Sequence, residues 1–109
     1  MATLPAGNPI KCVINKKCEA HPQISLLVLG IRNQIQWKAQ TKDTYYLWLP
    51  GGYFEGHLDD FELTITETDF LPIDPLIAIQ EGRILNYIFD SKHKPCQTKA
   101  EPPEIIIGS

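Results

Sequence analysis

The chain has little that would mark an enzyme or a membrane protein. Its longest apolar run, Leu26 to Leu29, is far shorter than the roughly 20 residues that span a bilayer. Gly51-Gly52 lacks the Gly-Lys-Ser/Thr sequence that completes a phosphate-binding loop, and no serine lies in a nucleophile elbow. We therefore expect no membrane span, and we predict that the chain is not an enzyme.

Cysteine is also sparse, with only Cys12, Cys18 and Cys96 in the chain. A small and odd number of cysteines is more typical of a reducing compartment than of a disulfide framework. Residues 1–8 lack the basic start and the apolar stretch of a signal peptide. These absences predict a cytoplasmic protein with free thiols.

The chain has no excess of positive charge, because 13 acidic residues outweigh 10 lysines and arginines and give a formal net charge of −3. A nucleic-acid-binding surface is normally basic, since cations must replace the counterions of the phosphates. Lysines do cluster near the two ends of the chain, where we interpret them as a solvated surface. They are Lys11, Lys16, Lys17, Lys92, Lys94 and Lys99.

What the chain does have is the size and composition of one globular domain. It contains 109 residues, of which 43% are hydrophobic and 21% charged, so it can bury one core. Proline and glycine punctuate the first residues, and prolines and lysines recur near the end. We predict an irregular N-terminal arm at 1–9, a β-rich domain at 10–90 and a C-terminal tail at 91–109.

Period-two alternation of apolar and polar residues is the strongest structural signal. It predicts half-buried strands at 35–39 and 61–65. Residues 24–31 are almost all apolar, as in a strand covered on both faces, and a hairpin turn at Arg32 to Gln34 would join them to 35–39. In the strand at 44–49, both faces carry large apolar side chains, so this strand is either central or offers one face to a partner.

These segments, with a further strand at 10–15, predict a mainly β fold, a small barrel or sandwich of five to seven short strands. Residues 74–90 leave two structures open. Asp74 and Pro75 resemble the start of a helix, whereas Glu81-Gly82 between two apolar runs favours a hairpin, which we prefer. Ile105 to Ile107 could add a strand to a sheet edge, in this protein or in a neighbouring one.

Two mirrored motifs suggest a metal site. Cys18 and His21 are separated by two residues, and so are His93 and Cys96. Zinc takes thiolate and imidazole ligands in tetrahedral sets, and chain ends often lie close together in single domains. Cys18, His21, His93 and Cys96 are therefore candidate ligands of a structural zinc ion, although free thiols and ordinary loop histidines remain the preferred interpretation. We expect no other cofactor.

Aromatic residues gather in one segment beside the Pro50-Gly51-Gly52 turn. Rigid rings next to a turn are frequent anchors of protein interfaces, because they bury a large area for a small loss of entropy. The candidate partner-binding residues are Tyr45, Tyr46, Trp48, Tyr53 and Phe54. Core packing is the preferred interpretation of these rings, and a protein-contact face comes second. The pair Asp59-Asp60 beside His57 is interpreted as a solvated loop.

These features predict a non-catalytic protein-interaction module, an accessory or regulatory subunit that docks through the aromatic strand and turn. Two alternatives remain: a small barrel that stacks single-stranded nucleic acid on the same rings, and a small domain with a structural zinc site. The sequence leaves self-association open.

Overall fold

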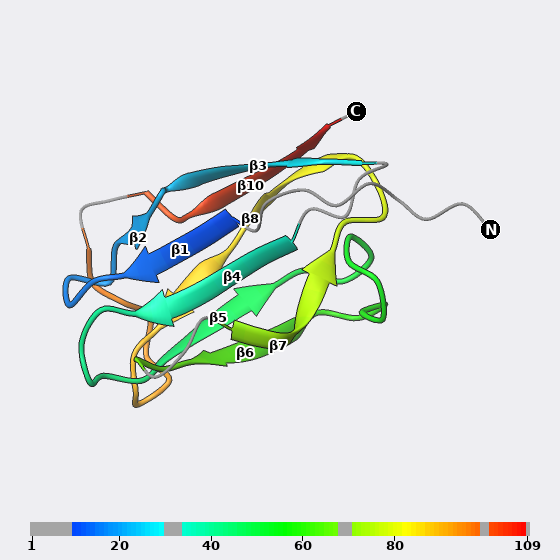
Figure 1. Ribbon diagram of the computed structural model, residues 1–109. Coiled ribbons are helices and arrows are strands. Elements are labelled where there is room, and N and C mark those ends of the chain that lie inside the picture. Colours follow the sequence, from blue (N-terminus) through cyan, green and yellow to red (C-terminus); the bar gives the residue numbers. More distant parts are fainter. Residues whose placement is uncertain (1–9, 30–33, 68–70, 99–100, 109) are drawn as a thin grey trace.

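Short strands are the regular secondary structure of the residues that the computed structural model describes, which are 10–29, 34–67, 71–98 and 101–108. Figure 1 shows the strands packed around one interior, without a helix in these ranges. No helix in the described part of the chain is long and apolar enough to cross a membrane. The strands are β1 (Ile10–Ile14), β2 (Ala20–His21), β3 (Ile24–Val28), β4 (Gln34–Ala39), β5 (Tyr45–Leu49), β6 (Phe61–Ile65), β7 (Leu71–Ile77), β8 (Gly82–Leu85), β9 (Tyr87–Phe89) and β10 (Glu104–Gly108).

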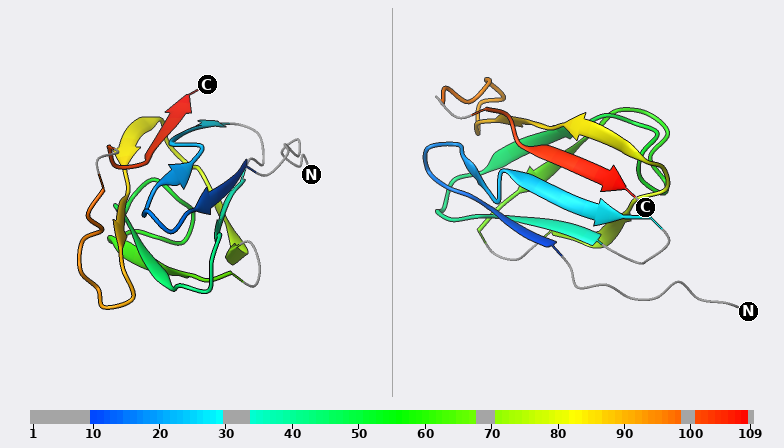
Figure 2. Two further views of the ribbon diagram at one scale, coloured as in Figure 1. Left: turned by 90° about the vertical axis from the view of Figure 1, so that its left-hand side faces the viewer. Right: turned by 90° about the horizontal axis from the view of Figure 1, so that it is seen from above.

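The strands form three small sheets with the orders β2-β1-β4-β7, β3-β10-β8 and β6-β5-β9. The end-on view in Figure 2 shows the three sheets around a shared interior. A backbone hydrogen bond of 2.9 Å from the amide of Ala39 to the carbonyl of Thr66 links the first sheet to the end of β6. The arrangement is sandwich-like, and the paired strands do not close into one continuous barrel within the described ranges.

Two of the strand pairs in the described residues are parallel, and neither pair joins strands that follow each other directly in the sequence. β1 runs parallel to β4, and β10 runs parallel to β3 with Ile106 opposite Leu26. Parallel neighbours cannot be joined by a tight turn, so the chain crosses between sheets instead of folding back locally. The first and last strands are thereby both built into the domain.

The core follows from the alternation seen in the sequence. In β5, Tyr45, Leu47 and Leu49 are buried, while Tyr46 and Trp48 point to the other face and are half-buried. Successive side chains of a strand point to opposite faces, so one face of β5 fills the core and the other faces outward. The largest fully buried side chains include Trp37, Phe54, Leu47 and Ile105.

The β class and the sandwich-like arrangement predicted from the sequence are confirmed, but the described residues form ten strands rather than five to seven. The predicted hairpin over 24–39 is wrong, because β3 pairs with β10 and β4 pairs with β1 and β7. The turn residues Arg32 and Asn33 lie outside the described residues. The strands at 24–28 and 34–39 are correct, but they belong to different sheets.

Residues 74–90 form neither the helix nor the hairpin considered for them. β7 pairs with β4, β8 pairs with β10, and β9 pairs with β5. Residues 104–108 are also not part of a loose tail or a sheet edge, because β10 lies between β3 and β8, with Ile105 and Ile107 buried. Apolar burial outweighs the loop-forming prolines that precede this strand.

A disulfide bond between Cys18 and Cys96 ties the turn after β1 to the segment after β9. The two Cα atoms lie 5.8 Å apart, within the usual range for a disulfide. The prediction of free thiols is therefore wrong for these two cysteines, because the fold places them side by side across a sequence separation of 78. Cys12 is free and buried.

Neighbouring leucines on β3 test which face packs on the core. Leu27 is 1% exposed and Leu26 is 63% exposed. Leu27→Ala should lower the free energy of unfolding by about 2–5 kcal/mol through lost apolar burial and the cavity that remains. Leu26→Ala, the matched control, should change it by no more than about 0.5 kcal/mol. Urea unfolding measures both values, and equal losses would contradict the orientation of β3.

Removing the disulfide should destabilise the fold. The double variant C18S/C96S should lose about 2–5 kcal/mol of unfolding free energy, because the bond restricts a long loop of the unfolded chain. A reducing agent should lower the urea midpoint of the natural protein and leave that of the double variant unchanged. Alkylation of the unfolded, unreduced protein should modify Cys12 alone, and modification of all three cysteines would contradict the bond.

Candidate functional site

Two turns of the same construction position Cys18 and His93. In the first turn, the side-chain oxygen of Asn15 accepts hydrogen bonds from the amides of Lys17 and Glu19 at 2.9 and 3.0 Å. In the second, Asp90 Oδ1 accepts hydrogen bonds from the amides of Lys92 and Lys94 at the same distances. The fourth residue of each turn, Cys18 or His93, has a left-handed backbone with φ of 62° or 60°.

The left-handed residue turns its side chain in a defined direction in each case. Cys18 reaches Cys96, as described above. The ring of His93 stacks on Tyr46, with a centroid distance of 3.6 Å and an interplanar angle of 19°. His93 Nε2 also lies 2.9 Å from Glu62 Oε1. The second turn therefore places an imidazole against the outward face of β5.

The four candidate zinc ligands do not converge on one point. The fold does bring the two motifs together, but Cys18 and Cys96 are bonded to each other. His93 faces Glu62, and His21 Nε2 lies 3.2 Å from Asn15 Nδ2. No group of three or more potential ligands is present among the described histidine, cysteine and acidic residues. A disulfide takes the place of the predicted zinc site, because a sulfur that bonds to another sulfur is no longer a thiolate ligand.

The five candidate partner-binding aromatics divide between core and surface. Tyr45 and Phe54 are buried, at 4% and 1% exposure, and so belong to the core alternative. Tyr53 is half-buried, packs against the core and covers Gly82. Only Tyr46 and Trp48 lie on an outward face. Successive side chains along β5 point to opposite faces of the sheet, which explains why Tyr45 is buried while Tyr46 and Trp48 face outward.

Two further aromatics, which the sequence analysis did not single out, complete this outward surface. Phe89 lies opposite Tyr46, and Tyr87 lies opposite Trp48, in the antiparallel pair of β5 and β9. The rings of Trp48 and Tyr87 are tilted at 45° with centroids 5.6 Å apart. We call Tyr46, Trp48, Tyr87 and Phe89 the aromatic face. The signal available in the sequence was the order aromatic, aliphatic, aromatic at Tyr87, Ile88 and Phe89, which puts both rings on one face of a strand. It was obscured because residues 74–90 left a helix and a hairpin open.

An exposed aliphatic surface covers the outer side of the sheet β3-β10-β8. The surface consists of Ile24, Leu26, Val28 and Leu85, whose side chains are each more than a third exposed, and of Ile106, which lies opposite Leu26. The same side carries an ion pair between Arg83 and Glu104. Contiguous apolar surface of this kind often marks a contact site. Among the described strands of this sheet, β3 and β8 are the edges.

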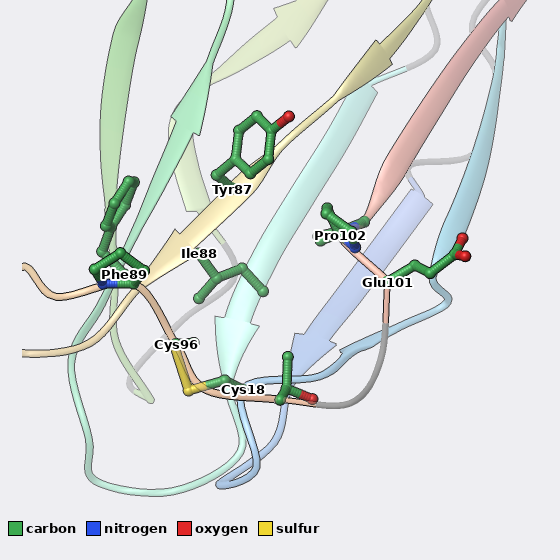
Figure 3. A pocket seen from close by; sticks show the side chains of 10 residues that line it. Cys18, Tyr87, Ile88, Phe89, Cys96, Glu101 and Pro102 are labelled. Atoms are coloured by element: carbon green, nitrogen blue, oxygen red, sulfur yellow. A yellow bond between two sulfur atoms is a disulfide. The ribbon is translucent and has the colours of Figure 1, made fainter.

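A hollow of about 330 Å³ opens beside the disulfide (Figure 3). Tyr87, Ile88 and Phe89 of β9 form one wall, and the segments on either side of residues 99 and 100 form the other. Side chains from both faces of β9 line the hollow because β9 is the edge strand of its sheet. The described lining residues are Cys18, Tyr87, Ile88, Phe89, Pro95, Cys96, Thr98, Glu101, Pro102 and Pro103.

The remaining chemically notable residues have structural partners. Asp60 accepts a hydrogen bond of 2.9 Å from the amide of Gly51, and the ring of His57 stacks on Phe61 at 3.8 Å. Burial raises the pKa of the Cys12 thiol, and a contact with the Ser25 hydroxyl at 3.3 Å lowers it in part. A thiol with a raised pKa is a poor nucleophile at neutral pH.

Neither the models of known protein families nor the curated proteins compared with the chain match it.

The turn at Asp90 makes a pH-dependent contribution that can be measured. Hydrogen bonds from the backbone amides of Lys94 and Lys92 lower the pKa of the Asp90 carboxyl below its ordinary value of 3.8. Because the folded pKa is lower than the unfolded one, the stabilisation is present above pH 3.8 and is lost as the pH falls through the folded value.

The variant Asp90→Asn should keep the turn, since Asn15 accepts the same two bonds in the equivalent turn. Urea unfolding of both proteins at pH 7 and below pH 3.8 should show the variant less stable at neutral pH, with a difference that narrows in acid. A difference that does not change with pH would contradict this role of the carboxylate. An NMR titration of the Asp90 carboxyl checks the direction of its shift independently.

Proposed function

We propose that the chain is a non-catalytic protein-interaction module, an accessory or regulatory subunit that docks through the aromatic face. One observation carries the proposal: Tyr46, Trp48, Tyr87 and Phe89 lie side by side on the outward surface of β5 and β9, and Tyr87 is 42% exposed. The turn through Tyr53 and Phe54, included in the sequence-based prediction, is not part of this surface because it packs on the core.

The geometry of the aromatic face supports its use as an anchor. Backbone pairing of β5 and β9 holds the four side chains in register before any partner arrives. Rigid, preorganised rings lose little conformational entropy on binding, and tyrosine and tryptophan are enriched among the residues that dominate interface energies. The rim is polar, with Glu62 and His93 in contact. An apolar centre with a polar rim is the usual composition of a protein interface.

The disulfide changes the compartment in which this module would act. The cytoplasmic prediction depended on the missing signal-peptide pattern and on the expectation of free thiols, whereas Cys18 and Cys96 form a disulfide. Disulfides persist in oxidising compartments and are rare in the cytosol. A partner in an oxidising compartment is therefore favoured over a cytoplasmic one. That the chain is not an enzyme stays a prediction from its sequence.

Single-stranded nucleic acid binding is a second candidate, supported by one observation. Lys92 and Lys94 belong to the turn whose His93 stacks on Tyr46, so two lysines lie close to the aromatic face. Base stacking combined with nearby cations is the usual basis of such binding. Glu62 in the same cluster and the net charge of −3 weigh against it. Absence of oligonucleotide retention in a low-salt filter-binding titration would remove this candidate.

The interaction proposal is tested by comparing the natural protein with Trp48→Ala and Tyr87→Ala. Leu58→Ala is the matched control, because Leu58 is a fully accessible apolar residue at 86% exposure outside the aromatic face. A partner captured from the native host by the natural protein and by the control should be lost with Trp48→Ala. With that partner purified, the variant should weaken binding by about 2 kcal/mol or more, roughly 30-fold, in calorimetry.

Retention of every captured protein by both variants would overturn the proposal. Near-native urea midpoints for Trp48→Ala and Tyr87→Ala would exclude unfolding as the cause of lost binding, since neither side chain belongs to the buried core.

A further inference from the structure

The hollow beside the disulfide borders the aromatic face, with which it shares Tyr87 and Phe89. One wall is the outer edge of β9, where Tyr87, Ile88 and Phe89 follow one another (Figure 3). The opposite wall is made of Pro102 and Pro103, and the Cys18–Cys96 bond lies at one end. A volume of about 330 Å³ is at the lower limit of small-molecule sites.

Backbone hydrogen bonds fix these walls at both ends, so the hollow is formed before any ligand binds. The amide of Cys96 donates to the carbonyl of Ile88 at 3.1 Å. At the other end, the amide of Asn86 donates to the carbonyl of Pro103 at 2.9 Å. Prolines and a disulfide add further rigidity, because each restricts the backbone. A preformed hollow binds its ligand without the cost of ordering loops.

The described lining residues carry one negative charge. Glu101 is the one ionisable carboxylate among the described lining residues, and none of these residues is a lysine, arginine or histidine. Glu101 stands at the rim, across from the rings of Tyr87 and Phe89, with its carboxylate turned outward (Figure 3). Aromatic faces attract cations, and a carboxylate at the rim repels anions. An adjacent hollow that shares Thr98 holds Lys17 and Glu19, whose opposite charges offset each other.

We propose that this hollow binds a small organic cation with an apolar skeleton, such as a substituted ammonium that carries a ring. The apolar body lies between the β9 edge and the two prolines, and the cationic group faces the aromatic rings, with the Glu101 carboxylate at the rim. The hollow shares Tyr87 and Phe89 with the aromatic face, whereas Tyr46 and Trp48 are not in its lining. The inference does not rest on the interaction proposal, because it concerns a small molecule bound between β9 and the prolines and needs no protein partner.

The test uses benzyltrimethylammonium as the probe and 3-phenylpropionate as its counterpart of similar size and opposite charge. Titrations followed by amide NMR shifts should show saturable changes at Tyr87, Phe89 and Cys96 with the cation. A ligand of this size with ordinary efficiency per atom should have a dissociation constant of about 0.1–10 mM. The anion should bind at least about tenfold more weakly, since both probes carry a phenyl ring but only the cation is attracted by the faces of the aromatic side chains.

Variants separate the contribution of charge from that of the rings. Glu101→Gln should weaken cation binding by about two- to fivefold, a modest effect because the carboxylate is exposed to solvent. Glu81→Gln is the matched control, because it makes the same charge change at an exposed residue outside the lining. Phe89→Leu should weaken binding further. Tyr87→Leu provides a second ring-deletion variant if Phe89→Leu does not give a native spectrum.

Three results would overturn the proposal. The first is the absence of saturable shifts up to about 50 mM cation, which is well above the expected dissociation constant. The second is equal affinity for the cation and the anion. The third is a set of shifts confined to Tyr46 and Trp48. None of these results would affect capture of a protein partner through Trp48, so failure here is distinguishable from failure of the interaction proposal.

Discussion

The parallel pairing of β10 with β3 is the constraint on which the rest of the structure depends. It brings the end of the chain into the centre of a sheet, with Ile105 and Ile107 buried beneath it. Without β10, the strands β3 and β8 would have no partner in the described sheet, because each pairs only with β10. Closing the loops between such distant segments costs conformational entropy, which the apolar burial of Ile105 and Ile107 helps to offset.

This pairing also determines where the two candidate sites lie. β8 and β9 are separated by one residue, Asn86, and β8 is bound to β10 while β9 is bound to β5. The chain therefore passes from one sheet to the next at Asn86, whose amide is bonded to Pro103 just before β10 begins. Its side-chain oxygen is buried without a hydrogen-bond partner in the described structure. The part of the aromatic face that β9 contributes lies after this bend, and the hollow lies along the outer edge of β9.

Local patterns in the sequence were enough to place strands, but not to pair them. Strict alternation located β6 at 61–65 and the two faces of β5, since these depend only on neighbouring residues. Partners of β3 and β4 depend on contacts between distant residues, which alternation does not encode. The same reason explains the errors at the sites: sequence spacing suggested that Cys18 and Cys96 could meet, but not that they would bond to each other and leave both histidines elsewhere.

The aromatic face and the core are the two sides of one strand, and this explains how a surface of large rings is compatible with a stable fold. Tyr45, Leu47 and Leu49 supply the burial that holds β5 in place, so Tyr46 and Trp48 are not needed for that purpose. The turn at Asp90 also supports Tyr46, because the ring of its left-handed residue His93 stacks on Tyr46. The same ring does not cover Trp48 and Tyr87, which contact each other. The core does not require these rings, but it does require the strands that hold them in register. The rings are therefore available for contact with a partner.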